Sequence, residues 1–217
     1  MNEAARACFA EIITQAKRPL FVAVTGDSGS GKSYLASLLA ALFEQAGMGV
    51  TVINHDEFLI ARAEREPMKA AHYTQGKYTG KTRWEILENM FRLDEYARVI
   101  GELRAGRAAS FYPYLRETGT VTDVKAVVEP ADFAVFDTSM LVGQMDFVVL
   151  VDVTQENIIA RKLVRDKDVR TPEQIVEMHQ LVQGYYWQDR GKPASPNLVV
   201  DNNDFAHVTV FRPPPAV

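Results

Sequence analysis

The stretch Leu20-Phe-Val-Ala-Val-Thr25 runs directly into Gly26-Asp-Ser-Gly-Ser-Gly31-Lys32-Ser33. Its first part is apolar and consists largely of β-forming residues, which predicts a strand buried on both faces. Its second part satisfies the pattern G-x-x-x-x-G-K-S/T, which forms a phosphate-binding loop where it joins a strand to a helix. From Ser33 to Ala46, leucines and Phe43 recur at helical spacing. We therefore predict a helix directly after the loop, as the motif requires.

The chemistry of this loop suits a nucleoside triphosphate. Glycines permit backbone angles that aim successive N–H groups inward, and a helix N-terminus adds roughly half a positive charge. We expect Lys32 to reach the β- and γ-phosphates and Ser33 to offer its hydroxyl to Mg²⁺. The alternative is a glycine-rich turn that only links strand to helix, and the motif alone does not separate kinases from GTPases or motor ATPases. The predicted nucleotide-binding residues are Gly26, Asp27, Ser28, Gly29, Ser30, Gly31, Lys32 and Ser33.

Short apolar strands alternate with helices along the rest of the chain. After the first strand, strands are predicted at residues 50–54, 134–137, 147–152, 197–201 and 207–211. Helices are expected at 1–18, 155–164 and 172–189, and from the capping box Thr82-Arg-Trp-Glu85 to Gly106, with a hairpin over 111–128. This alternation predicts an α/β fold with a mostly parallel sheet, helices on both faces, and ligands at the carboxyl ends of the strands.

The composition is that of an ordinary globular chain. Of its 217 residues, 47% are hydrophobic, enough for one core, so we predict a single domain over residues 1–217. The 24 basic and 28 acidic residues leave a net charge of −4, which provides no overall basic field for nucleic acid. The lone Cys8 cannot form an internal disulfide, and the apolar runs fall short of the ~20 residues that span a membrane. We expect a cytoplasmic protein that binds neither nucleic acid nor membrane.

Two aspartates at predicted strand ends are candidates for catalysis and metal binding. Asp56 follows the strand at 50–54, where a carboxylate can accept the proton of an attacking hydroxyl. Asp137 ends the strand at 134–137 and is expected to hold Mg²⁺ directly or through water, with Asp152 as its competitor. In either place an aspartate can instead be a helix cap or a turn residue.

A basic segment follows the strand that ends at Asp152. We expect residues at about 165–171 to form a lid in which Arg165 and Arg170 neutralise charge in the transition state, while Arg161 binds nucleotide. The alternative is a solvated helix face with ion pairs such as that of Arg161 with Asp166. The cations of the segment are Arg161, Lys162, Arg165, Lys167 and Arg170.

Together these blocks resemble the phosphoribulokinase/uridine kinase family of P-loop kinases, from about Leu20 to Asp204. The resemblance rests on the loop 26–33, on His55-Asp56-Glu57-Phe58, on residues 128–137 and on the basic segment 161–170. It implies a P-loop NTPase/kinase-like three-layer fold with a mostly parallel five-stranded sheet, an arginine lid and an acceptor-binding insertion at about 56–128. It also implies ATP- and Mg²⁺-dependent phosphorylation of a small-molecule alcohol with Asp56 as the base, and a homo-oligomer as a possible assembly.

The acceptor side departs from the nucleoside kinases of that family. Lys77-Tyr-Thr-Gly-Lys81 stands where those enzymes carry a sugar-binding aspartate, and Leu-Arg-Glu-Thr-Gly-Thr rather than a histidine follows Tyr114. The departures leave open a nucleotide-binding regulatory protein without kinase activity, whereas a GTPase would need an Asn-Lys-x-Asp sequence that the chain lacks. We expect an altered acceptor site made of Tyr73, Tyr78, Lys81, Arg83, Tyr114 and Arg116, whose cations suit an anionic acceptor.

Overall fold

Two compact units make up the chain in the computed structural model. The structure describes residues 1–71, 73–74, 77–78, 87–168, 170–177, 179 and 195–214. The first unit comprises Met1–Ile53 and Asp132–Val217, and the second comprises Asn54–Ala131. The second unit therefore includes the segment at 56–128 for which the sequence predicts acceptor binding, a role that stays a prediction.

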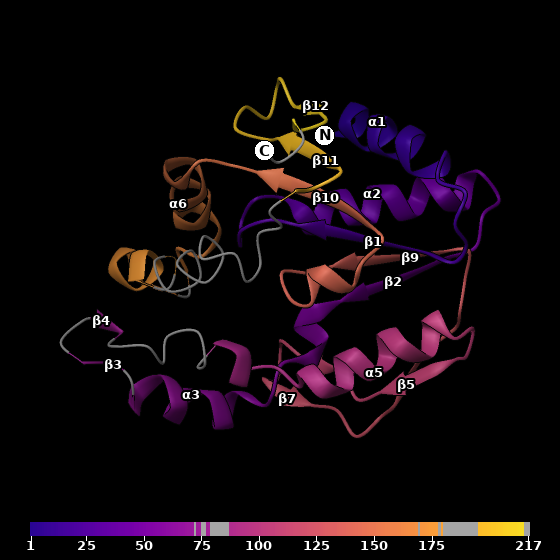
Figure 1. Ribbon diagram of the computed structural model, residues 1–217. Helices are drawn as coiled ribbons and strands as arrows, with labels where there is room; N and C mark the ends of the chain where they lie inside the picture. Colours follow the sequence, from indigo (N-terminus) through magenta and orange to yellow (C-terminus); the bar gives the residue numbers. More distant parts are fainter. Residues whose placement is uncertain are drawn as a thin grey trace. The chain divides into compact units, whose positions relative to one another are not determined.

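A six-stranded sheet forms the centre of the first unit (Figure 1), with the strand order β12-β11-β10-β1-β9-β2. β1 pairs in parallel with both β9 and β10, and β10 pairs in parallel with β11. At one edge, β12 runs antiparallel to β11. The strands are β1 (Leu20–Thr25), β2 (Val50–Asn54), β9 (Phe133–Asp137), β10 (Phe147–Asp152), β11 (Leu198–Asp201) and β12 (Thr209–Phe211).

The sheet has one strand more than the five that the family resemblance implies, while the six strands predicted from the residues and the mostly parallel α/β arrangement are confirmed. The additional strand is the edge strand β12, in which Val210 pairs with Val200 of β11. A parallel neighbour would need a crossover of about a dozen or more residues, whereas a short connection suffices for an antiparallel one. The short segment between Asp201 and Thr209 therefore permits only the antiparallel return.

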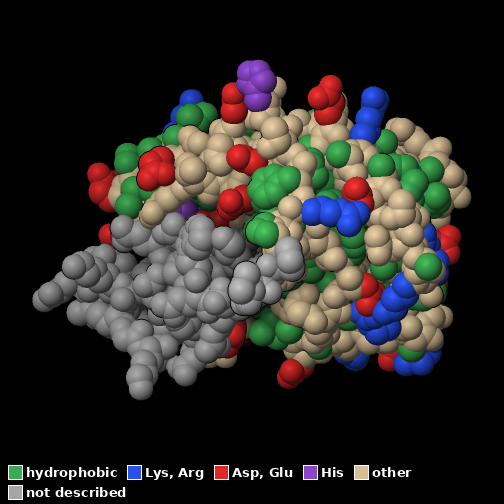
Figure 2. All heavy atoms as spheres, turned by 45° about the horizontal axis from the view of Figure 1, so that its top comes forward, with side chains coloured by type: hydrophobic (Ala, Val, Ile, Leu, Met, Phe, Trp, Pro, Cys, Tyr) green, Lys and Arg blue, Asp and Glu red, His purple; other side chains and the backbone are tan. Residues whose placement is uncertain are grey.

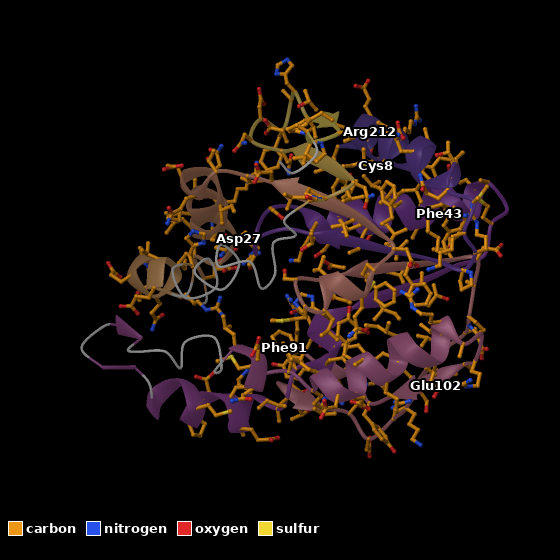
Figure 3. The ribbon with its side chains drawn as sticks, viewed as in Figure 1. Cys8, Asp27, Phe43, Phe91, Glu102 and Arg212 are labelled. Carbon is orange, nitrogen blue, oxygen red and sulfur yellow. The ribbon has the colours of Figure 1, made fainter. Side chains whose placement is uncertain are left out.

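One face of this sheet is covered by α1 (Asn2–Ile13) and α2 (Lys32–Gln45) (Figure 1). All six residues of β1 are buried, as predicted for a strand inside a parallel sheet. Phe43 of α2, labelled in Figure 3, stacks on Phe133 of β9 with ring centroids 4.1 Å apart. The core between helices and sheet includes Leu20, Val22 and Val24 of β1 with Leu35, Leu39 and Phe43 of α2.

The other described helices of the first unit follow β9 and β10. The short helix η2 (Val142–Gln144) packs through Val142 against Ala23, which points to the opposite face of β1. The hydroxyl of Thr154 accepts the N–H of Asn157 and caps α6 (Gln155–Arg165). Residues 172–177 are helical after the predicted cap, in which Thr171 and Gln174 exchange two hydrogen bonds between backbone N–H groups and side-chain oxygens.

The second unit consists of short elements and the helix α5. Phe58 stacks on Phe111 with centroids 4.6 Å apart and meets Tyr96 at 4.7 Å, and all three side chains are buried. β5 pairs with β8 and β6 with β7, all antiparallel, which confirms the predicted hairpin over 111–128. The elements are η1 (His55–Phe58), α3 (Arg62–Ala71), β3 (Tyr73–Thr74), β4 (Lys77–Tyr78), α5 (Leu93–Arg104), β5 (Ala109–Phe111), β6 (Tyr114–Leu115), β7 (Thr120–Val121) and β8 (Ala126–Val128).

The single long helix predicted up to Gly106 is wrong, because the chain turns just before α5. Residues 87–89 are helical, but the N–H of Arg92 then donates to the carbonyl of Phe58, and Met90 accepts the N–H of Ile60. These bonds to the 58–60 segment replace helical ones, a tertiary pairing that side-chain spacing does not encode. The predicted capping box at 82–85 lies outside the described residues.

Charged side chains of both signs occur on the face drawn in Figure 2, among uncharged surface and small apolar patches. This mixture agrees with the near balance of 24 basic and 28 acidic residues in the sequence. In the part of the chain that the structure describes, no helix has the length and apolar character needed to cross a membrane.

Replacing Phe43 with alanine is expected to lower the free energy of unfolding by about 3–5 kcal/mol, because a buried ring is lost and a cavity remains. Phe211→Ala serves as the control, because this side chain on β12 is 48% exposed. We expect it to cost less than about 1 kcal/mol. Urea unfolding monitored by circular dichroism measures both variants, and equal losses would contradict the assignment of Phe43 to the core.

Candidate nucleotide-binding and phosphotransfer site

The loop after β1 comes too close to its surroundings for side chains at two positions. A Cβ on Gly26 would lie 2.5 Å from Ser30 Oγ and 2.6 Å from the carbonyl oxygen of Val151 in β10. Gly31, the cap of α2, has a φ of +99°, and a Cβ there would lie 2.9 Å from Asn202 Nδ2. The two glycines therefore let the backbone lie against β10 and lead into the N-terminus of α2, where N–H groups favour an anion.

The parallel register of the sheet brings Asp137 to this loop. Asp137 pairs with Val24, two residues before Gly26, and its Oδ1 lies 4.0 Å from Nζ of Lys32. Ser33 stands exposed in the first turn of α2. Within the described ranges, no group of three or more His, Cys, Asp or Glu side chains could hold a metal ion. One carboxylate and one hydroxyl nevertheless suit Mg²⁺, which usually fills its shell with water and substrate phosphate.

Arg161 of α6 connects the loop with the segment that follows β11. Its guanidinium lies 3.4 Å from the carbonyl oxygen of Ser30, also donates to the carbonyl of Asn202, and stacks over the ring of Phe205 at 4.0 Å. The buried side chain of Asn202 donates to the same Ser30 oxygen at 2.7 Å. The residue predicted to bind nucleotide thus touches the backbone of the predicted phosphate-binding loop.

Three ionisable side chains are buried beside the loop: Asp27, Lys162 of α6 and His179. Nζ of Lys162 lies 3.1 Å from Nδ1 of His179, which is 3.9 Å from Oδ2 of Asp27. Burial raises the pKa of Asp27. The charge of Lys162, a hydrogen bond from the N–H of Ser28 and the charge of Lys32 lower this pKa by smaller amounts. Burial lowers the pKa of Lys162 to about 8. Burial and the nearby charge of Lys162 lower the pKa of His179 to about 4. Figure 3 labels Asp27 at the loop end of β1.

The two arginines predicted to act from a lid both pair with Asp166. Arg165 donates to both carboxylate oxygens, at 2.6 and 2.9 Å, and Nη1 of Arg170 lies 3.3 Å from Oδ2. The hydrogen bond from Arg165 and the surrounding positive charges lower the pKa of Asp166. Asp166 thus pairs with Arg165 and Arg170, whereas Arg161, named for this pair in the alternative to a lid, contacts Ser30 and Asn202. The side chains of Arg165 and Arg170 are 56% and 48% exposed.

In the second unit, Asp56 lies in η1, just beyond the end of β2. Asn54, not Asp56, caps this short helix by accepting the N–H of Asp56 at 2.9 Å. The carboxylate of Asp56 pairs with Arg116 of the β6–β7 hairpin and lies 3.4 Å from Nε2 of His55. The second unit therefore presents the carboxylate of Asp56 beside the largely exposed Arg116. The alternative that Asp56 only caps a helix does not apply, because Asn54 is the cap.

Of the predicted acceptor residues, the structure describes the side chains of Tyr114 and Arg116. The hydroxyl of Tyr114 accepts a hydrogen bond from Arg65 at 2.5 Å, and the Arg65 guanidinium lies 4.7 Å from the ring centre. Arg62 donates to the backbone carbonyl of Arg116 at 2.9 Å, which ties the hairpin to α3. The side chains of Tyr73, Tyr78, Lys81 and Arg83 lie outside the described residues.

Asn202 and His179 contribute to the site without having been predicted. Asn202 comes directly after β11, so the rule that identified Asp137 at the end of β9 would also have identified Asn202. His179 meets Lys162 across 17 residues of sequence, and no periodic pattern indicates that contact.

A strand, a glycine-rich loop and a helix, with a carboxylate at the end of the adjacent parallel strand, define a P-loop nucleotide-binding protein. The model of the Phosphoribulokinase / Uridine kinase family matches residues 21–209, and the chain belongs to this family of kinases.

Individual relatives are distant in sequence. The uridine kinase of Limosilactobacillus reuteri (strain DSM 20016) is 27% identical over 163 residues, which are 71% of this chain and 68% of the relative. A possible uridine kinase from Bacillus stearothermophilus has a TM-score of 0.66 at 19% identity, covering 92% of this chain and 98% of that one. D-glycerate 3-kinase from Cryptococcus neoformans var. grubii has a TM-score of 0.69 at 13% identity, covering 97% of this chain and 97% of that one. At such identities the structural likeness shows a shared fold.

Gly26→Ala is expected to weaken ATP binding by about tenfold or more, since the new Cβ would meet the Val151 carbonyl and displace the loop. Gly101→Ala on α5 is the control, because a Cβ there meets nothing within 4 Å. It should leave ATP affinity unchanged and stabilise the protein by roughly 0.5–1 kcal/mol. Isothermal titration calorimetry and thermal unfolding measure these effects, and equal ATP affinities for both variants would contradict the close approach at Gly26.

Proposed function

We propose that this chain transfers the γ-phosphoryl group of ATP to a hydroxyl group of a small molecule. The observation that carries the proposal is the loop 26–33 between β1 and α2, with Lys32 4.0 Å from the carboxylate that ends β9. A cation and backbone N–H groups at one helix N-terminus suit a polyphosphate, and membership in a kinase family favours transfer over simple binding.

Ser33 and Asp137 would hold Mg²⁺ together with the nucleotide. The hydroxyl and carboxylate oxygens are hard donors, and Asp137 is almost fully buried, which limits competition from bulk water. Bound there, Mg²⁺ would neutralise negative charge on the phosphates. Lys32 adds a fixed positive charge next to the same carboxylate.

Asp56 is proposed as the general base. Asp56 follows β2 directly in the chain, and ligands of parallel sheets of this kind bind outside the carboxyl ends of the strands. As the acceptor oxygen bonds to the γ-phosphorus and the bond to the β-phosphate oxygen breaks, the hydroxyl proton passes to the carboxylate of Asp56. The paired Arg116 places a positive charge beside this carboxylate.

Arg165 and Arg170 are proposed to neutralise charge on the transferring group. Both pair with Asp166, and their side chains are about half exposed, so that a phosphate group arriving from solvent can compete with Asp166 for charge-assisted hydrogen bonds from them. Because charge in a phosphoryl transition state spreads over three oxygens, added cations stabilise it more than water does.

Arg116 and Tyr114 are proposed to contact the acceptor, together with Tyr73, Tyr78, Lys81 and Arg83. Arg116 sits beside the proposed base and its side chain is 72% exposed, so its guanidinium can also receive a carboxylate or phosphate group of an acceptor. The similar proteins include a uridine kinase and a D-glycerate 3-kinase, whose acceptors differ in charge. We propose that the acceptor is an anionic alcohol. A screen over nucleosides, sugars, hydroxy acids and sugar phosphates tests this.

Asp56→Asn is expected to reduce turnover by about 10²–10⁴-fold, the usual effect of removing a general base. Nucleotide affinity should stay near that of the wild type, whereas Lys32→Ala should weaken it. Product formation with the acceptor found in the screen gives turnover, and calorimetry with ATP gives affinity. Full turnover in Asp56→Asn would remove the assignment of the base, and ATP binding without any phosphorylated product would favour a regulatory protein.

Arg116→Gln is expected to raise the KM of the anionic acceptor by about 10–100-fold through loss of a charge-assisted hydrogen bond, while the KM of ATP stays unchanged. Arg107→Gln is the matched control, because Arg107 is an exposed arginine of the same unit that pairs with Glu102. Steady-state kinetics with both substrates separates the two parameters. If Arg116→Gln lowers kcat with an unchanged acceptor KM, Arg116 acts on Asp56 and does not hold the acceptor.

A further inference from the structure

The phosphate-binding loop carries a buried acid of its own. Asp27 is 5% exposed and lies in the loop that is expected to surround phosphate groups. A carboxylate there repels a polyphosphate, and low local polarity strengthens the repulsion. The loop therefore needs a compensating charge near Asp27 if it is to bind nucleotide tightly.

Lys162 supplies this charge from α6. Its side chain is 6% exposed, and its stem packs on the loop, because a Cβ on Gly29 would lie 3.4 Å from Cε of Lys162. Of the positive charges that lower the pKa of Asp27, Lys162 has the largest effect. Lys32 has a smaller one and is proposed to bind the phosphates. Arg165 at the end of α6 and Asp166 directly after it act on the pKa of Lys162 with opposite signs.

His179 holds the amine of Lys162 in place. An ammonium group can only donate hydrogen bonds, so Nδ1 of His179, 3.1 Å away, accepts, and the ring is neutral with its proton on Nε2. The same Nδ1 is 3.9 Å from Asp27 Oδ2, so the imidazole stands next to both charges while carrying none itself. The ring is fully buried, which excludes water from competing for the amine.

We propose that His179 positions Lys162 to neutralise Asp27, so that these three residues set how tightly the loop binds a nucleoside polyphosphate. Lys162 and His179 are positioning residues in this account and act on the nucleotide through the charge of Asp27. The inference rests on nucleotide binding within the proposed function and is independent of the acceptor reaction.

A double-mutant cycle with ATP and ADP tests the proposal. Lys162→Met should weaken binding of both nucleotides by about tenfold or more, because Asp27 is left uncompensated. Adding Asp27→Asn to it should restore the affinity to within a few-fold of the wild type. If Lys162 contacts the phosphates directly, the double variant will bind as weakly as Lys162→Met, and the proposal is overturned.

The pH dependence provides a readout that a purely structural role would not move. The Kd ratio of Lys162→Met to the double variant should grow as pH rises through the pKa of Asp27, which burial raises above its ordinary value, because only the single variant retains a carboxyl that ionises over the loop. The ratio cancels titration of the nucleotide itself. A constant ratio, or one that falls, would overturn the charge compensation.

Conservative replacement tests the role of His179. His179→Gln, whose side-chain oxygen can accept from Lys162, should retain affinity to within a few-fold, whereas His179→Leu should bind as weakly as Lys162→Met. Equal affinities of the Gln and Leu variants would overturn the positioning role. The thermal unfolding of each variant is measured first. If the double variant Asp27→Asn/His179→Leu recovers nucleotide affinity, the lower affinity of His179→Leu arises from charge and not from misfolding.

Lys125→Met on the second unit is the charge-matched control and should bind nucleotide as the wild type does. A wild-type protein that binds nucleotide, obeys the cycle and phosphorylates no acceptor would refute the proposed kinase function alone. A wild-type protein that binds neither ATP nor ADP would refute both.

Discussion

A carbonyl oxygen of β10 lies where the side chain of residue 26 would otherwise be, and the rest of the site depends on this close approach. With only a hydrogen atom on Gly26, the loop can lie against Val151 and Ser30 and then enter α2 through the left-handed conformation of Gly31. Backbone N–H groups at the N-terminus of α2 become available to an anion as a result. Larger side chains at the two glycines would move the loop, and the N–H groups with it.

The parallel sheet surrounds this loop with polar groups from distant parts of the sequence. Because β1 lies between β9 and β10, residues that end these strands gather at the same edge as the loop. Asp137 reaches Lys32 in this way, and Asn202 beyond β11 reaches the carbonyl of Ser30. The strands themselves are apolar and buried, so their packing holds the polar groups in place without relying on surface ion pairs.

Burial decides how strongly the charged side chains near the phosphate-binding loop interact. Arg165 and Arg170 are half exposed, where water and salt weaken their attraction to Asp166. Asp27, Lys162 and His179 are shielded from water, so Asp27 and Lys162 act on each other's ionisation and Lys162 acts on that of His179. The neutral imidazole keeps the lysine amine hydrogen-bonded without adding a second positive charge.

The sequence alone determined the features whose cause is local. The strand at 20–25, the glycine-rich loop and the helix after it follow from side-chain period and from glycine geometry, and the structure has all three in the predicted place. Asp137 and Asp56 were found because each comes at or just after the end of an apolar strand. The turn before α5 differs from the single long helix that was predicted, because it is decided by backbone pairing with a segment elsewhere in the chain. Only the tertiary structure decided that Arg116 pairs with Asp56 and that His179 and Lys162 lie beside Asp27, since these contacts join residues far apart in sequence, and neither side-chain period nor motif spacing carries that information.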